Sequence, residues 1–368
     1  MKTLAIFGST GSIGKSSLRV FERNKSKFKL IYLSSHNRHN LLLKQSIKYK
    51  PKNILITNTA HKIKNKKLIN IDAAIKRKKI DYVISGVSGY DALKFNLNLL
   101  KISKNLLIAN KETIICGGKL FLEKAKKNRC NIIPIDSEHY SIFFFLKNFL
   151  FKEKTDIKKL FITASGGPFL KKKINYNETV SKALRHPIWK MGKKISIDSS
   201  TFSNKVMELF EAKILFNLNP KKLEMIVEDS SNIHSIIQLN ENIYIPIMHK
   251  PNMELTISSS LGLRDFNQMI NLKNLKIQLS QPNLKKFPVI KTGYHILNYY
   301  KHAGMILFTV FNERLVKMFL NKQIKYGDIV FNLVRVFKKK QIILLSKKSV
   351  KNLNEIYKLI KFAQNYRI

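Results

Sequence analysis

Short apolar runs that end in glycine or polar residues recur through the first third of the chain. Leu4–Phe7 is followed by a glycine-rich turn, a helical pattern from Lys15 to about Arg23, and a second apolar run at Lys29–Leu33. Strand, turn, helix and strand in this order open a doubly wound sheet. Later runs predict three more strands and one helix of about Leu120 to Asn128; the strands are Asp81–Ser85, Asn105–Ala109 and Ile132–Ile135.

The second half of the chain first continues this α/β pattern and then becomes helical. Lys159–Thr163 predicts a strand, and the alternation from Glu224 to Ile247 predicts one or two more. The pattern weakens around Ser258–Gln281, which indicates a linker. The remainder predicts helices at Thr292–Ala303, Met305–Asn321, Tyr326–Val336 and Lys351–Gln364.

The turn after the first strand has the glycine spacing G-x-x-G-x-x-G, at Gly8, Gly11 and Gly14. Glycines at a strand-to-helix turn let backbone N–H groups approach a pyrophosphate at the helix N-terminus, where the helix dipole favours anions. The turn therefore predicts a dinucleotide site. The alternative is a glycine-rich turn with a purely structural role.

The end of the second strand indicates which dinucleotide binds. NAD sites usually place an acid there to hold the ribose 2′-hydroxyl. Here the strand runs into Ser34-Ser35-His36-Asn37-Arg38, which contains no acid. Hydroxyl groups and Arg38 suit a 2′-phosphate, so NADPH is favoured, unless these basic residues only follow the general excess of lysine and arginine.

Asp136 and Glu138 follow the strand predicted at Ile132–Ile135. In extended backbone, residues two apart project to the same side, so both carboxylates would point at one place. Two adjacent anions are costly without a cation, and Mg²⁺ accepts a few carboxylates beside substrate oxygens. The pair therefore predicts a divalent metal site, with an ordinary acidic loop as the alternative.

Polar groups also gather after residue 160. The turn Ala164–Phe169 offers hydroxyl and N–H groups to an anion. The loop Arg185–Gly192 holds the only tryptophan and indicates a mobile lid, or else a packed surface loop. Ile197–Thr201 resembles an N-cap cluster. On the helix that follows, Asn204, Lys205 and Glu208 share one face, as a functional group or as a simple Lys–Glu pair.

The charge of the chain is extreme. Its 368 residues include 68 Lys+Arg and 23 Asp+Glu, a formal net charge of +45. The lysines are spread from Lys2 to Lys361, so weak binding to polyanions is expected and specific nucleic-acid recognition is not. Cys116 and Cys130 form no disulfide framework, and no signal peptide or membrane span is evident. A cytoplasmic protein is expected.

Six motifs in order resemble the 1-deoxy-D-xylulose 5-phosphate reductoisomerase family. They are GSTGSIG at 8–14, ANKE at 109–112, PIDSEH at 134–139, SGGPF at 165–169, RHPxWxMG at 185–192 and DSSTFSNKxxE at 198–208. The resemblance implies an N-terminal Rossmann-like NADPH domain (1–135), a central α/β catalytic domain that also makes the homodimer contact (136–257), a linker (258–282) and a C-terminal α-helical domain (283–368).

The resemblance also implies the site residues. Asp136, Glu138 and Glu208 would bind Mg²⁺ or Mn²⁺, with Co²⁺ as a further candidate. Substrate would meet these two glutamates and Ser137. It would be held, chiefly by its phosphate, by Ser165, Ser199, Asn204 and Lys205, with His186 on the flexible lid. Lys111 joins the three acids as a catalytic residue. The cofactor would contact Thr10, Gly11, Ser12, Ile13, Asn37, Arg38, Asn110, Lys111, Glu112 and Gly192.

The chemistry implied is an isomerisation of 1-deoxy-D-xylulose 5-phosphate through a retro-aldol and aldol step, followed by NADPH reduction to 2-C-methyl-D-erythritol 4-phosphate. Several positions depart from the family pattern: His36 and Val206 replace usual glycines, Glu228–Ser231 replaces His-Pro-Gln-Ser, and Asn252 and Glu254 replace Asp and Arg. A different NADPH oxidoreductase would need a nucleophilic cysteine. A basic nucleic-acid-binding protein with an old enzyme fold would need a clustered basic face.

Overall fold

The computed structural model describes residues 1–58, 68–75, 78–149, 156–172, 174–189 and 191–368. Two compact units can be distinguished. The first consists of Met1–Thr113, Phe121–Tyr140 and Asn252–Gln268, and the second of Ile114–Leu120, Ser141–Pro251 and Met269–Ile368. Among the described residues, no helix is long and apolar enough to cross a membrane.

The first unit is built on a six-stranded parallel sheet with the order β3-β2-β1-β4-β5-β6. The order reverses beside β1, as in a doubly wound sheet, so the α/β prediction is confirmed. The central strand β1 is buried on both faces, and Leu4 to Phe7 are all 0% exposed. The strands are β1 (Lys2–Phe7), β2 (Phe28–Ser35), β3 (Asn53–Ile56), β4 (Ile80–Ser85), β5 (Ser103–Ile108) and β6 (Asn131–Pro134).

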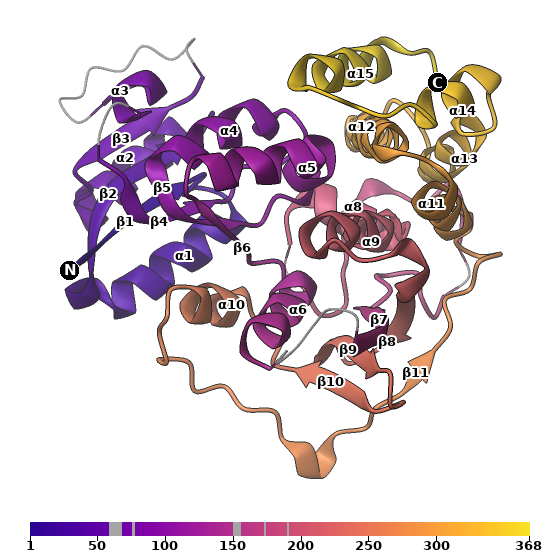
Figure 1. Cartoon of the computed structure of the whole chain (residues 1–368), viewed down its shortest axis with the longest axis horizontal. Coiled ribbons are helices and arrows are strands. Elements are labelled where there is room, and N and C mark those ends of the chain that lie inside the picture. Colours follow the sequence, from indigo (N-terminus) through magenta and orange to yellow (C-terminus); the bar gives the residue numbers. More distant parts are fainter. Residues whose placement is uncertain (59–67, 76–77, 150–155, 173, 190) are drawn as a thin grey trace. The chain divides into compact units, whose positions relative to one another are not determined.

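Helices connect these strands, and Figure 1 shows α1 (Ser12–Arg23) and α4 (Ala92–Ile102) on opposite faces of the sheet. The buried side of α1 carries Leu18, Val20 and Phe21. Asn110 caps the next helix by accepting the backbone N–H of Thr113, which fixes where the helix after β5 begins. The other helices here are α2 (His39–Tyr49), α3 (Ile71–Ile75) and α5 (Lys111–Lys127).

A segment far along the chain completes the first unit. Helix α10 (Met253–Ser260) packs against α1, and Glu254 forms ion pairs with Arg19 and Arg23. The hydroxyl of Thr256 donates to the carbonyl of Ile135 at 3.1 Å. No local sequence pattern predicts this packing, because Glu254 lies more than two hundred residues from Arg19 and Arg23 in sequence.

The second unit contains a mixed five-stranded sheet with the order β10-β9-β7-β8-β11. Only the β7–β8 pair is parallel, and the other neighbours are antiparallel. The strands are β7 (Ile157–Ala164), β8 (Leu223–Glu228), β9 (Ile233–Leu239), β10 (Tyr244–Met248) and β11 (Leu279–Ser280). Four helices accompany them: α6 (Ser137–Asn148), α7 (Val180–Ala183), α8 (Lys193–Ser200) and α9 (Ser203–Phe216).

The chain ends in five helices, orange to yellow in Figure 1. The most buried is α12, which packs against α8, α9, α13, α14 and α15. All four helices predicted in this region are present, but α14 was not predicted because seven residues are too few to reveal a period. The helices are α11 (Pro288–Tyr299), α12 (His302–Leu320), α13 (Tyr326–Val336), α14 (Lys340–Ser346) and α15 (Leu353–Asn365).

Candidate active site

The glycine-rich turn leads directly into α1. The N–H of Gly11 donates to the carbonyl of Gly8 at 3.0 Å, and a Cβ at Gly14 would overlap that same carbonyl oxygen. Glycine is therefore required at position 14 for packing alone. Gly11 is also the N-cap of α1, so no side chain caps this helix. The first backbone N–H groups of α1 point out of its N-terminus, where the helix dipole favours an anion.

Arg38 folds back onto this turn. Its Nη1 donates to the carbonyl of Thr10 at 3.2 Å, while the hydroxyl of Thr10 lies 2.9 Å from the Ser35 hydroxyl. The side chain of Asn37 accepts a hydrogen bond from Asn58 at 2.8 Å. The glycine turn and the end of β2 are thus joined by hydrogen bonds, with an exposed guanidinium at their edge.

Lys111 and Asp136 form a pair with little exposure. Lys111 is 3% exposed, and its Nζ lies 3.0 Å from Oδ2 of Asp136. The other oxygen, Oδ1, lies 3.2 Å from Nδ1 of His139. Asn110 holds the start of α5 against the loop after β4, because its Nδ2 donates to the carbonyls of Val87 and Gly89.

The backbone around Glu138 differs from the prediction. The strand β6 ends at Pro134, and Ser137 already begins α6, so Glu138 lies in the first helical turn and not in extended backbone. The carbonyl of Asp136 accepts the N–H of Tyr140 at 2.8 Å, which closes this turn. A carboxylate in the first turn of a helix is favoured by the helix dipole.

The predicted face of α9 is confirmed. Nδ2 of Asn204 lies 2.5 Å from Oε1 of Glu208, and Nζ of Lys205 lies 2.5 Å from Oε2. Glu208 is 1% exposed and Lys205 is 6% exposed. A carboxylate buried to this degree needs such partners.

One carboxylate oxygen of each of Asp136, Glu138 and Glu208 lies within 4.8 Å of the corresponding oxygens of the other two. Oxygen-only ligands of this number suit a hard divalent ion that keeps some of its waters, such as Mg²⁺ or Mn²⁺. The donor set therefore fits a divalent metal.

The turn after β7 and the loop around His186 lie close together. Gly166 and Gly167 have φ of 79° and 63°, which favour glycine, and the Ser165 hydroxyl lies 3.4 Å from Nε2 of His186. Nδ1 of His186 accepts the N–H groups of Ile188 and Trp189 at 3.2 and 3.0 Å. Burial, together with the charge of Lys205, lowers the pKa of His186 to about 4.

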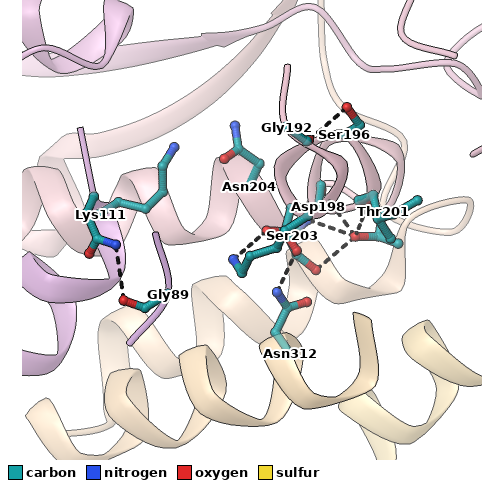
Figure 2. Close-up of polar contacts among 12 residues, drawn as sticks. Gly89, Lys111, Gly192, Ser196, Asp198, Thr201, Ser203, Asn204 and Asn312 are labelled. Atoms are coloured by element: carbon teal, nitrogen blue, oxygen red, sulfur yellow. Dashed lines mark hydrogen bonds and ion pairs between the residues drawn. The ribbon is translucent and has the colours of Figure 1, made fainter. Parts of the chain in front are cut away.

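The polar cluster Ile197–Thr201 was predicted to be an N-cap. In the structure it forms the C-terminal end of α8. The helix begins after Gly192, whose carbonyl accepts the Ser196 hydroxyl (Figure 2). It ends where Phe202 adopts a left-handed conformation. The N-cap composition misled the prediction because contacts distant in sequence hold these residues in a helix. Asp198, for example, accepts a hydrogen bond from Asn312.

The lid loop also reaches β9. The ring of Trp189 lies edge-on to His234 with centroids 6.3 Å apart, and His234 stacks on His249 at 3.7 Å. Sequence reasoning missed this histidine pair, because one histidine on β9 and another just after β10 form no motif. Lys190, within the predicted lid, lies outside the described residues.

Three family models match the chain, described as 1-deoxy-D-xylulose 5-phosphate reductoisomerase (residues 4–118), its C-terminal domain (132–216) and DXP reductoisomerase C-terminal domain (248–367). The proteins of that name from Pelagibacter ubique (strain HTCC1062) and Clostridium novyi (strain NT) are 38% and 35% identical. The alignments cover 98% and 90% of this chain and 97% and 90% of the two relatives. The chain belongs to the 1-deoxy-D-xylulose 5-phosphate reductoisomerase family.

A solved structure of this family has the same fold. The crystal structure of DOX-P reductoisomerase in complex with NADPH, fosmidomycin and magnesium is 27% identical and superposes with a TM-score of 0.90, covering 99% of this chain and 97% of that one. The predicted arrangement of a Rossmann-like domain, an α/β domain and C-terminal helices is therefore confirmed as a fold class. The predicted domain boundaries stay predictions.

Three departures from the reductoisomerase pattern have local partners in this structure. Glu254 pairs with Arg19 and Arg23, so the carboxylate that replaces the usual arginine is neutralised. Asn252 caps α10 by accepting the N–H of Glu254 at 2.9 Å. The carboxylate of Glu228 accepts backbone N–H groups of the turn that follows β8.

The departure at Val206 is a packing change. Val206 on α9 is 0% exposed, and a Cβ placed on Gly293 of α11 would overlap its methyl groups. A larger residue at 206 is therefore matched by the absence of a side chain at 293. These four changes have local partners in turns, a cap, surface ion pairs and packing, and Asp136, Glu138 and Glu208 are all present in the chain.

Proposed function

We propose that this chain converts 1-deoxy-D-xylulose 5-phosphate to 2-C-methyl-D-erythritol 4-phosphate with NADPH and a divalent metal, in the non-mevalonate isoprenoid pathway. The observation that carries the proposal is the convergence of three carboxylates in a member of this family. In the first step, one carbon–carbon bond of the substrate breaks and another forms, giving a branched aldehyde. In the second, hydride from NADPH adds to the aldehyde carbon and a proton adds to its oxygen.

Asp136, Glu138 and Glu208 would hold the divalent ion, Mg²⁺ or Mn²⁺, with Co²⁺ as a further candidate. Such an ion would act as a Lewis acid toward the substrate carbonyl. Ser137 lies within the same turn as Glu138 and hydrogen-bonds to it, so its hydroxyl would reach the same substrate oxygens. Lys111, beside Asp136, offers a buried positive charge to the developing oxyanion.

The substrate phosphate would bind to Ser165, His186, Ser199, Asn204 and Lys205. Nδ1 of His186 accepts two backbone N–H groups, so a neutral ring carries its proton on Nε2 and can donate it to a phosphate oxygen. Lys205 supplies the positive charge. The loop Arg185–Gly192 would then close over the substrate and exclude water, which protects the aldehyde intermediate.

NADPH would bind to the first unit. Its pyrophosphate would meet Thr10, Gly11, Ser12 and Ile13 at the start of α1, and its 2′-phosphate would meet Arg38 beside Asn37. The nicotinamide end would meet the start of α5 and the lid, which contribute Asn110, Lys111, Glu112 and Gly192. Arg38 is well placed for this role because it is exposed and already bonded to the Thr10 carbonyl.

The assembly is proposed to be a homodimer formed through the second unit. The strand β10 lies at the edge of its sheet, and Ile243 and Tyr244 are 55% and 57% exposed. A cavity of about 550 Å³ beside it is lined mainly by apolar side chains, among them Phe144, Phe149 and Ile245. Substituting Ile245→Lys should convert a dimer to a monomer in sedimentation analysis; a dimer that persists unchanged places the contact elsewhere.

The proposed location is the cytoplasm, with no membrane partner and no specific nucleic-acid partner. The net charge of +45 still leads to weak binding of DNA and RNA in dilute salt. Such binding should show no sequence preference and should vanish near ~0.15 M salt, while sugar-phosphate turnover persists. Tight, sequence-selective binding at that salt concentration would favour a nucleic-acid-binding protein instead.

The direct test uses the full chain with 1-deoxy-D-xylulose 5-phosphate, NADPH and Mn²⁺. NADPH oxidation should require both sugar phosphate and metal, and mass spectrometry should identify the methylerythritol phosphate. Glu208→Gln should lower kcat/KM by at least about 100-fold, whereas Glu224→Gln, which alters a surface pair with Lys159, should not. Full activity of Glu208→Gln would refute the proposed metal site.

A further inference from the structure

The junction between α8 and α9 carries three of the five proposed phosphate ligands, Ser199, Asn204 and Lys205. Phe202, in the middle of this junction, has φ of 65° and ψ of 2°, a left-handed conformation that is costly for a residue with a side chain. Such a turn persists only where the surrounding structure holds it. Two of the contacts that hold this junction come from helices α12 and α13.

Asp198 is the first of these anchors. It is 1% exposed, Nζ of Lys194 lies 2.7 Å from its Oδ2, and Nδ2 of Asn312 donates to its Oδ1 at 2.7 Å (Figure 2). Its neighbour in sequence is Ser199. Both oxygens of a buried carboxylate are thus held, and the last turn of α8 is fixed with them.

The hydrogen bond to Asp198 is the feature that best accounts for an asparagine at position 312 of α12. Asn312 is fully buried, and the same helix buries Phe308, Phe311 and Leu315 around it. Within the described part of the chain its own Oδ1 has no hydrogen-bond partner, which costs about 1–3 kcal/mol for a buried acceptor. A leucine would pack better in this position. The amide is therefore best explained by the hydrogen bond that it donates to Asp198.

Tyr326, at the start of α13, is the second anchor. It is 0% exposed, and its hydroxyl donates to the carbonyl of Ser200 at 2.8 Å. Its ring lies edge-on to Phe169 with centroids 5.1 Å apart. Phe169 ends the turn that carries Ser165, so one tyrosine contacts both segments that are proposed to bind the phosphate.

We propose that Asn312 and Tyr326 are positioning residues for the substrate phosphate. Neither is assigned a contact with the substrate. Asn312 acts through Asp198 on Ser199, and Tyr326 acts through the end of α8 and through Phe169. The C-terminal helices thereby set the spacing of the phosphate ligands. This inference rests on the proposed phosphate site, and a misplacement of about 1 Å in such a site costs up to about 100-fold in activity.

The test compares Asn312→Leu with a matched control on the same helix. Thr309 is equally buried and donates its hydroxyl only within α12, to the carbonyl of Met305, so Thr309→Val removes a buried hydrogen bond without affecting α8. Asn312→Leu should raise the KM for the sugar phosphate and the inhibition constant of inorganic phosphate by about 10- to 100-fold, with the KM for NADPH unchanged. Thr309→Val should leave all three constants unchanged.

A swap tests the hydrogen bond itself. Asn312→Asp alone places two carboxylates together and should be worse than Asn312→Leu, whereas Asp198→Asn combined with Asn312→Asp restores an amide–carboxylate pair and should recover phosphate inhibition. Tyr326→Phe keeps the ring against Phe169 and removes only the hydroxyl, so it should raise the same two constants with the fold intact. If the Asn312 variants do not fold, Tyr326→Phe alone tests the proposed positioning role.

Lys205→Ala separates the two proposals. If Lys205→Ala raises the inhibition constant of phosphate but Asn312→Leu and Tyr326→Phe only lower the Tm, the phosphate site is correct and the positioning role is wrong. If Lys205→Ala leaves phosphate inhibition unchanged, the proposed phosphate site itself is wrong, and the positioning role falls with it.

Discussion

The ammonium group of Lys111 lies 3.0 Å from Oδ2 of Asp136, and both side chains are largely buried. A cation so close to a proposed metal ligand lowers the negative potential that attracts a metal ion. Removing it has two opposite consequences, because the same lysine is proposed to stabilise the oxyanion of the reaction. Metal affinity and turnover should therefore change in opposite directions.

We expect Lys111→Met to bind Mn²⁺ more tightly by a few-fold and to lower kcat by about 100-fold or more. Calorimetric titration with Mn²⁺ measures the first effect, and steady-state kinetics at saturating metal measures the second. Lys104→Met is the matched control, since Lys104 pairs at 2.8 Å with Asp81 on the surface. Parallel loss of metal binding and turnover in Lys111→Met would show that the lysine supports the site only structurally.

A second prediction concerns the pH range of the lid. Burial and the nearby charge of Lys205 lower the pKa of His186 from 6.5 to about 4. As pH falls from 6.5 to about 4, the unfolded chain takes up the proton first, so this residue lowers the free energy of unfolding across that window. Protonation also removes the Nδ1 acceptor used by Ile188 and Trp189.

Trp189 is the only tryptophan, so its fluorescence reports this loop directly. The emission maximum should stay constant from pH 8 to about 5.5 and shift only near pH 4. His186→Gln should abolish the step at pH 4 because glutamine does not titrate. A midpoint near 6.5 would mean that His186 is solvated and that the loop does not depend on its neutral form.

The third prediction concerns cofactor choice. Arg38 is exposed, yet it is held beside the glycine turn through the Thr10 carbonyl, and no acid follows β2. Arg38→Ala should raise the KM for NADPH by about tenfold or more and change the KM for NADH little, because only NADPH carries the 2′-phosphate. Lys44→Ala, another exposed cation nearby on α2, is the control. Equal effects on both cofactors would make Arg38 a general surface charge.

Local patterns predicted the parts of this protein that depend on neighbours in sequence. The apolar runs that became β1, β4 and β5, the glycine turn, and the face of α9 with Asn204, Lys205 and Glu208 all follow from short spacings. The hydrogen bond between Asn312 and Asp198 joins positions 114 residues apart, and a single asparagine in an apolar helix carries no signal.

The difference between contacts local in sequence and contacts distant in sequence also explains two errors in the predicted elements. Ile197–Thr201 has the composition of an N-cap, but Asn312 and Tyr326 hold it in the last turn of α8. Glu138 follows a strand, but the new helix α6 begins one residue before it. In both places the preference of a few residues was outweighed by packing or by a helix start that no single position reveals.

The last prediction tests whether Val206 and Gly293 are matched. A Cβ at Gly293 would overlap the methyl groups of Val206, so Gly293→Ala should destabilise the protein by about 1–3 kcal/mol through overpacking. In a Val206→Ala background those methyl groups are gone, and alanine is better than glycine in a helix by roughly 0.5–1 kcal/mol. The same Gly293→Ala change should then cost little or even stabilise.

Urea unfolding of the four proteins in this cycle gives the coupling free energy, which should reach at least about 0.5 kcal/mol for two residues in contact. Gly304→Ala is the control in both backgrounds. Its added Cβ would meet Tyr300 and Ser346 and not Val206, so its cost should not depend on residue 206. Additive effects of Val206→Ala and Gly293→Ala would show that α11 shifts to admit the extra methyl group and that the two residues are not matched.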